Sequence, residues 1–181
     1  MQDDIILSVL KAIADDDLVA PAEPEPEDDE LEATPARATR WTMPGFCAKA
    51  RVTTSFGDLP VEALRLRDPV KTQSGEYRPV AWVDRMHLDE GFLSGFRGAA
   101  PIRFQQNALG RNYPNQNVML SPGQRVVVPQ EWSEEEILTA DELSVRTNIE
   151  RLLSTQVTYY MFHVGAPDVV LVDGMWCPVS P

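Results

Sequence analysis

Two thiols and two imidazoles are the side chains of this sequence best suited to nucleophilic or proton-transfer chemistry. The thiols belong to Cys47 and Cys177, and the imidazoles to His87 and His163. A thiol attacks as its thiolate, so it needs a neighbouring base or cation to be reactive. The two cysteines lack the paired spacing of zinc ligands, and two histidines leave few ways to build a zinc site or a general base. We therefore expect neither a metal nor a cofactor.

Other catalytic motifs and an excess of basic residues are missing from the sequence. It contains no glycine-rich phosphate loop and no Ser, His and Asp set at a recognised spacing. Its 28 acidic residues outnumber its 16 basic ones, which gives a formal net charge of -12. Because clustered Lys and Arg hold nucleic-acid phosphates, this balance argues against a nucleic-acid partner.

The region that would position these groups has the pattern of an all-β domain. From about Pro44, short runs of aliphatic, β-branched and aromatic residues are separated by turn signals. Side chains alternate over residues 77–88 and 157–164, and again over 64–67, where Leu alternates with Arg. Residues 134–153 instead favour one or two short helices. We predict a mainly β fold for residues 44–181, with one or two short helices.

An ordered series of short motifs runs through this β region. In chain order these are Gly45-Phe46-Cys47, Val52-Thr53-Thr54, Gly57, Pro60-Val61-Glu62-Ala63-Leu64, Asp68, Val70, Thr72, Pro79-Val80-Ala81-Trp82-Val83, Pro101-Ile102-Arg103-Phe104, Ala108-Leu109-Gly110, Pro114, Ser121-Pro122-Gly123-Gln124-Arg125-Val126 and Val169-Val170-Leu171-Val172-Asp173-Gly174. Together they resemble the bacterial branch of the Hedgehog/intein (Hint) family of self-processing domains. The resemblance implies a compact Hint-like β fold.

The resemblance also implies a chemistry, from which this chain departs. In the family, a thiol or hydroxyl at the first position attacks the preceding carbonyl while a nearby His moves protons. Here the nucleophile position falls on Gly45, and the His of the Ser-Pro-x-His-Arg block is replaced by Gln124. The closing block has Met161 and Pro167 where His is common. We expect no catalytic residues, and interpret the chain as a degenerate, non-catalytic member that serves as a binding or structural module.

An active autoprocessing domain is the alternative. Cys47 lies two residues past the nucleophile position, and a two-residue deletion before Val52 would make it the attacking thiol. His163 would then be the base, since His87 is expected at a solvated strand end. In the family the first and last strands meet, so the resemblance leaves open a Cys47–Cys177 disulfide, although an intracellular protein normally keeps its thiols reduced.

The acidity of the chain is concentrated in its first 34 residues, whose charge is -11. Residues 3–14 predict a short amphipathic helix and residues 20–35 a disordered acidic linker, both within a region that spans residues 1–43. A helix this short is marginal in water, so we expect it to dock on its own body, on another copy or on a protein partner; a solubilising spacer is the alternative. The predicted docking face is Ile5, Ile6, Val9, Leu10 and Ile13.

The location of the protein follows from two further patterns. No stretch approaches 18 apolar residues, and the chain begins with acidic residues where a signal peptide would be basic. The sequence predicts no membrane span, no ordinary signal peptide and a cytoplasmic location, with export by a non-classical route left open. A role as an accessory of a secreted or phage-derived assembly, attached through the tail, is a third hypothesis for function.

Overall fold

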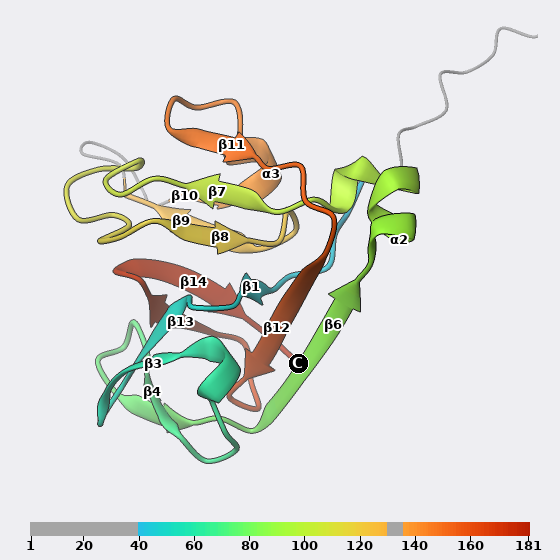
Figure 1. Cartoon of the computed structure of the whole chain (residues 1–181). Coiled ribbons are helices and arrows are strands. Elements are labelled where there is room, and N and C mark those ends of the chain that lie inside the picture. The colour runs from blue at the N-terminus through green and yellow to red at the C-terminus, as the bar shows by residue number, and fades with distance from the viewer. Residues whose placement is uncertain (1–39, 130–135) are drawn as a thin grey trace, which may run out of the picture. The chain divides into compact units, whose positions relative to one another are not determined.

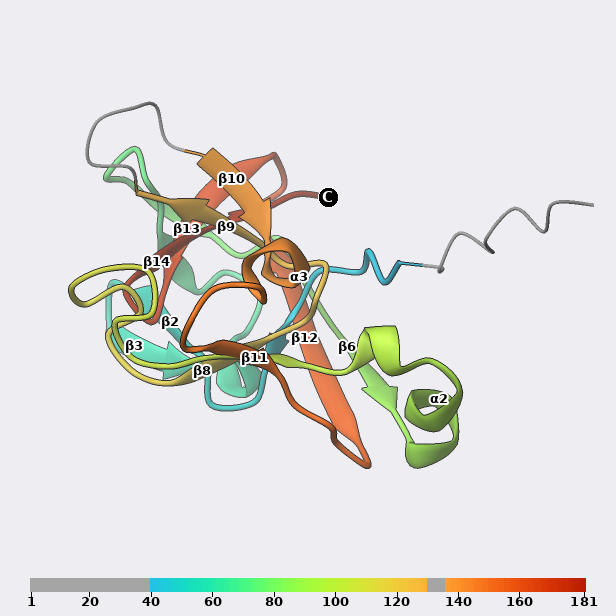
Figure 2. The same cartoon turned by 90° about the horizontal axis from the view of Figure 1, so that it is seen from above.

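The computed structural model describes residues 40–129 and 136–181, which fold mainly into antiparallel strands (Figures 1 and 2). The predicted N-terminal helix, residues 3–14, and the predicted acidic linker, residues 20–35, lie outside these residues. The strands are β1 (Phe46–Cys47), β2 (Arg51–Thr54), β3 (Gly57–Pro60), β4 (Pro69–Lys71), β5 (Tyr77–Pro79), β6 (Trp82–Leu88), β7 (Ile102–Phe104), β8 (Val118–Leu120), β9 (Arg125–Val128), β10 (Glu136–Thr139), β11 (Ile149–Arg151), β12 (Val157–His163), β13 (Asp168–Val172) and β14 (Met175–Val179). Two short α-helices, α2 (Glu90–Gly95) and α3 (Ala140–Leu143), and two 3₁₀ turns, Val61–Ala63 and Arg97–Ala99, complete the described elements. The prediction of a mainly β Hint-like fold with one or two short helices is confirmed.

The first sheet has the strand order β11-β7-β8-β1-β12-β6. Its longest pairing joins β12 to β6 over seven residue pairs, from Val157–Leu88 to His163–Trp82. On its other edge β12 pairs with β1 at only two positions, through Tyr159 and Tyr160. This difference in ladder length leaves part of β12 without a second neighbour among the described residues.

The second sheet has the order β14-β13-β2-β4-β5, with β3 paired to β2, and β9 and β10 form a separate ribbon. Strand β9 packs against β14, so the ribbon adjoins the second sheet. The chain crosses from the second sheet to the first between β5 and β6, at the buried Val80. The single alternating run predicted over residues 77–88 is therefore two strands in two sheets.

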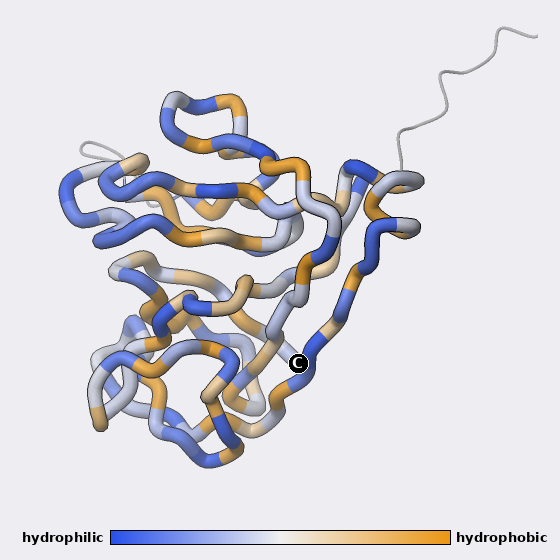
Figure 3. The backbone as a smooth tube through the Cα atoms, in the orientation of Figure 1, coloured by the Kyte–Doolittle hydropathy of each residue, from blue (hydrophilic) through white to orange (hydrophobic). Residues whose placement is uncertain are grey.

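Two groups of buried side chains hold these layers together, and the alternation of hydrophilic and hydrophobic residues along the strands is visible in Figure 3. The larger group lies between the sheets and includes Phe46, Val52, Phe104 and Phe162. The smaller group surrounds Tyr159 near α2. Burial of large apolar side chains is the main favourable term for folding, at about 25 cal/mol per Å².

The predicted strand over residues 157–164 is confirmed as β12, and α3 lies within residues 134–153, where one or two short helices were expected, but the alternation predicted over residues 64–67 was wrong. On either side of α3 the described residues of this region form strands, because Ile137 and Leu138 pair with the buried strand β9 and Ile149 pairs with Phe104. Sheet pairing with buried partners overrides their helix propensity. Leu64 is buried and Leu66 exposed, because a 3₁₀ turn precedes them in place of a strand.

Helix α2 was not predicted from the sequence. Asp89 caps it by accepting a hydrogen bond from the Phe92 N–H at 2.9 Å. Helix α3 has a capping box, in which Thr139 and Glu142 each accept a hydrogen bond from the other's backbone N–H. No helix of the described residues is long and apolar enough to cross a membrane.

Candidate functional site

The five residues that lead into β1, residues 41–45, lie along the turn formed by residues 121–124; we call them the entry segment. Ser121 makes three contacts with it. Its Oγ accepts a hydrogen bond from the Trp41 indole N–H at 2.8 Å and donates one to the Met43 carbonyl at 2.6 Å. Its backbone N–H donates to the Gly45 carbonyl at 2.9 Å. The turn therefore binds the entry segment through both side chain and backbone.

The turn of residues 121–124 and the entry segment also approach closely through their backbones, at Gly123 and Thr42. A Cβ atom on Gly123 would lie 2.4 Å from the Thr42 carbonyl carbon and oxygen, so only glycine fits there. The Trp41 ring packs among three aromatic side chains, at centroid distances of 5.9 Å from Phe92, 6.0 Å from Phe96 and 6.3 Å from Tyr159. The entry segment is thus part of the folded body, although the sequence pattern placed residues 41–43 in the N-terminal region of residues 1–43.

Gly45 ends the entry segment in a conformation that disfavours a side chain. Its φ of +154° is rarely adopted by other residues, and a Cβ there would lie 3.0 Å from the Tyr159 Cβ. Both strain and crowding therefore oppose a cysteine or serine at position 45.

Gln124 is 1% exposed and uses its amide to join three parts of the chain. Its Oε1 accepts a hydrogen bond from the Gly45 N–H at 3.0 Å. Its Nε2 donates to the Arg125 carbonyl at 2.9 Å and to the Pro178 carbonyl at 3.2 Å. A neutral imidazole offers one donor and one acceptor, so it could not make all three bonds. The amide suits a structural junction between the start of β1, β9 and β14.

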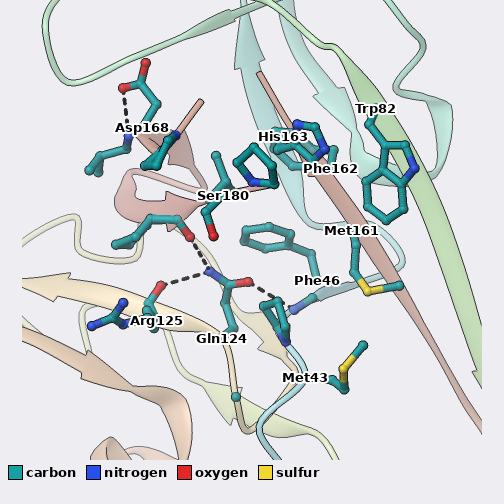
Figure 4. A pocket seen from close by; sticks show the side chains of 18 of the residues that line it. Met43, Phe46, Trp82, Gln124, Arg125, Met161, Phe162, His163, Asp168 and Ser180 are labelled. Atoms are coloured by element: carbon teal, nitrogen blue, oxygen red, sulfur yellow. Dashed lines mark hydrogen bonds between the residues drawn. The ribbon is translucent and has the colours of Figure 1, made fainter. Parts of the chain in front are cut away.

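A cavity of about 810 Å³ opens beside this junction. Figure 4 shows how Phe46, Gln124, Met161 and His163 lie around it. The four residues at the positions where the resemblance implies the nucleophile and histidines all line this one cavity: Gly45, Gln124, Met161 and Pro167. The fold therefore brings together residues that are up to 122 positions apart in the sequence, from Gly45 to Pro167.

His163 is the only histidine that lines this cavity. Its ring stacks on Trp82, with the centroids 5.3 Å apart and 14° between the ring planes. Its Nδ1 accepts a hydrogen bond from the Gly165 N–H at 3.0 Å. His87 lies on the neighbouring strand β6, away from the cavity, and is exposed, as expected. Its Nδ1 is 3.0 Å from the Thr158 hydroxyl.

Cys47 does not line the cavity. It is 3% exposed, packs in the smaller core near Tyr159, and pairs with that residue in the β1–β12 ladder. Burial raises the pKa of its thiol to about 12. His163 lies four residues beyond Tyr159 along β12, and at about 3.3 Å per residue this places it roughly 13 Å from the position that pairs with Cys47. The structure therefore does not bring together the thiol and the imidazole of the autoprocessing alternative.

The second thiol is also separate. Cys177 lies in the larger core, fully buried, and burial raises its pKa above its ordinary value. Both cysteines are free, so the disulfide left open by the sequence is not formed. Among residues 40–129 and 136–181 no cluster of His, Cys, Asp or Glu is arranged to hold a metal ion.

The family model of the Hint domain matches residues 44–178. The chain belongs to the Hint domain family. A search of the curated proteins found no match.

Solved structures similar to this Hint domain include inteins and an intein-like domain. A bacterial intein-like domain from Clostridium thermocellum has 11% identity and a TM-score of 0.49, with coverage of 76% of this chain and 99% of that one. The MchDnaB-1 intein has 10% identity and a TM-score of 0.47, with coverage of 75% and 99%. The AceL NrdHF class 3 split intein, a splice-inactive variant, has 12% identity and a TM-score of 0.43, with coverage of 76% and 98%.

The charged residues at this site of the Hint domain are few. Asp168 forms an ion pair with Arg78 at 3.3 Å and accepts a hydrogen bond from the Val169 N–H. Arg125 is exposed at the cavity. The hydroxyls that line the cavity belong to Thr42 and Ser180, and neither forms a hydrogen bond with His163 in the described part of the chain. The site has apolar walls, one ion pair and one further cation.

Sequence reasoning missed Trp41 and Ser121 as parts of this site. Ser121 stood in the motif, but only as a marker of the family. Trp41 lies close to the acidic linker and outside the motif. Its hydrogen bond to Ser121 joins residues 80 positions apart, so the local sequence around Trp41 could not indicate it.

Proposed function

We propose that this Hint domain does not process itself and serves as a binding or structural module. One observation carries the proposal: the Gly45 N–H donates to the buried Gln124 amide at 3.0 Å. At the two positions where the family pattern has a nucleophile and a histidine, this chain uses a structural hydrogen bond.

The chemistry of an acyl shift supports this interpretation. The reaction needs an activated nucleophile and a titrating group within hydrogen-bond reach. Glycine has no side chain to attack with, and an amide does not exchange protons near neutral pH. Cys47 is buried, its pKa is raised to about 12, and it lies away from the cavity, so its thiol stays protonated.

The entry segment gives a second line of support. Trp41 packs in the smaller core and Met43 is bound by Ser121, so this flank of the domain contributes to the packing of the body. Self-cleavage at Gly45 or Cys47 would break the chain between the entry segment and the rest of the domain, to which these contacts bind it. A fixed entry segment suits a module that carries its N-terminal region permanently.

Intact-mass spectrometry of freshly purified protein tests the proposal. We expect one species near 20.2 kDa that is stable over days at neutral pH. Fragments of residues 1–46 and 47–181 that disappear in Cys47→Ala but persist in the matched control Cys177→Ala would show that the chain is autoprocessing. The control separates the chemistry of Cys47 from the general effect of removing a buried thiol.

We also propose that the N-terminal segment attaches the domain to a protein partner. This rests on the sequence alone, because Ile5, Ile6, Val9, Leu10 and Ile13 lie outside the described residues. Replacing Ile6 and Leu10 by Asp should remove any partner that co-purifies with the full chain, whereas Asp15→Asn and Asp16→Asn should not. Unchanged co-purifying proteins after deletion of residues 1–34 would contradict this role.

A further inference from the structure

One edge of β12 is unpaired where it reaches the cavity. Strand β6 pairs with β12 along its whole length, up to His163. On the opposite edge the ladder with β1 ends at the pair Phe46–Tyr160. Among the described residues, no strand continues this ladder beyond Tyr160.

The direction of the free backbone groups follows from the hydrogen bonds of β1. The Gly45 carbonyl accepts from Ser121 on the β8 side, so the next residue, Phe46, directs its N–H and C=O to the β12 side. Tyr160 faces Phe46, and by the same alternation Phe162 directs its N–H and C=O to this edge. The residue that would oppose Phe162 is Pro44, which has no N–H and lies outside β1. Within the described part of the chain the backbone of Phe162 therefore has no strand partner on this edge, and the residue as a whole is 4% exposed.

The lining of the cavity agrees with an open edge. Three consecutive residues of β12, Met161, Phe162 and His163, all line it. Neighbouring side chains of a strand point to opposite faces, so a cavity that contacts all three meets the edge of the strand. The end of the chain, residues 178–181, lines the opposite side in the same consecutive manner. The cavity is a slot between two lengths of backbone, and Figure 4 shows Ser180 across it from Phe162.

The side chains of the slot specify the occupant further. Phe46, Met161 and Phe162 give it apolar walls, with Phe46 and Phe162 in ring contact at 5.7 Å. Asp168 forms an ion pair with Arg78, whereas Arg125 is in no ion pair with any described residue, although its charge helps to lower the pKa of Glu142. An occupant with backbone amides, an apolar side chain and a carboxylate would satisfy each of these groups.

We infer that the slot binds an extended peptide of another protein, which adds as a strand to β12 opposite Phe162. The side chain of its residue opposite Phe162 lies against Phe162, that of the next residue lies on the other face against Met161, and an acidic residue pairs with Arg125. Strand addition to a free edge gives affinity through main-chain hydrogen bonds and selectivity through the side-chain pockets. The inference rests on the proposed function, since a self-processing domain would need this cavity for its own chain.

Selection from a phage-displayed library of random seven-residue peptides against the immobilised full chain tests the inference. We expect enrichment of peptides that carry an aliphatic residue and an Asp or Glu. Arg125→Glu should weaken the selected peptide, made synthetically, by about tenfold through reversal of one charge pair, and the exposed Arg111→Glu should leave its affinity unchanged. No enrichment, or equal binding by both variants, would overturn the inference.

Backbone pairing has its own readout. On binding of the selected peptide, exchange of the Phe162 amide hydrogen measured by NMR should slow at least tenfold. A peptide N-methylated at the residue that pairs with Phe162 should bind at least tenfold more weakly, because one ladder hydrogen bond is lost. Unchanged exchange, or full affinity after every single N-methylation, would overturn strand addition. Intact mass measured on the same samples reports separately on the proposed function.

Discussion

Gln124 joins three parts of the chain through its buried side-chain amide. Its amide makes three hydrogen bonds from a buried position. Gln124→His should lower the free energy of unfolding by about 1–3 kcal/mol, because at least one buried partner is left unpaired. Urea unfolding at pH 8 measures this, and Gln156→His, at an exposed position, is the matched control. Equal stability of the two variants would contradict the structural role.

Gly45 offers a second prediction at this scale. Gly45→Ala meets both backbone strain and the 3.0 Å approach to the Tyr159 Cβ, and should cost about 1–3 kcal/mol. Gly110→Ala is the control, since Gly110 has a similar φ of +140° but open space around its Cβ position. Thermal unfolding should show a larger loss for Gly45→Ala. If Gly110→Ala loses as much, strain alone explains the glycine at position 45.

The motif resemblance singled out four residues that lie together in the structure, but it did not indicate on which side of β1 Cys47 is buried. Gly45, Gln124, Met161 and Pro167 stand at the positions that the resemblance singles out, and all four line one cavity. The side of β1 on which Cys47 is buried depends on pairing with Tyr159, a residue 112 positions away. A one-residue change of register would have turned that thiol to the other face.

At the scale of elements, hydrogen bonds with Ser121 hold the entry segment against the turn of residues 121–124. Trp41→Phe keeps the ring packing but removes the indole N–H bond to Ser121, and should cost about 1 kcal/mol. Trp41→Ala also empties the aromatic cluster and should cost about 2–4 kcal/mol. Urea unfolding of these variants, of Ser121→Ala and of the Trp41→Phe/Ser121→Ala double variant measures the coupling. Additive losses from the two single variants would argue against the bond.

The elements also show where sequence reasoning succeeds. Strand β12 was predictable because its alternation extends over seven residues, from Val157 to His163. The strands β10 and β11 were not, because Glu136–Thr139 and Ile149–Arg151 are short and acquire their form from pairing with β9 and β7. Helix α3 had a local signal, a Thr139 and Glu142 capping box, that identifies its start within a region of mixed propensity.

At the scale of the whole domain, Asp173 joins distant parts of the fold and should give stability a characteristic pH dependence. Its carboxylate accepts hydrogen bonds from the Arg51 N–H at 3.1 Å and from Gln116 at 2.5 Å. Burial nevertheless raises its pKa from 3.8 to about 6. Between these values the folded state binds more protons than the unfolded state, so this residue's contribution falls as pH rises from about 4 to about 6.

The loss over that interval should be on the order of 2 kcal/mol, since one pKa unit corresponds to about 1.4 kcal/mol. Asp173→Asn removes the titration, so the difference in free energy of unfolding between the native chain and this variant should shift in favour of the variant as pH rises. The exposed Glu76→Gln is the control for general charge effects. Urea unfolding at half-unit steps from pH 4 to pH 7 measures all three proteins. Parallel curves for the native chain and Asp173→Asn would mean that Asp173 titrates alike in the folded and unfolded states, and that its hydrogen bonds compensate fully for its burial.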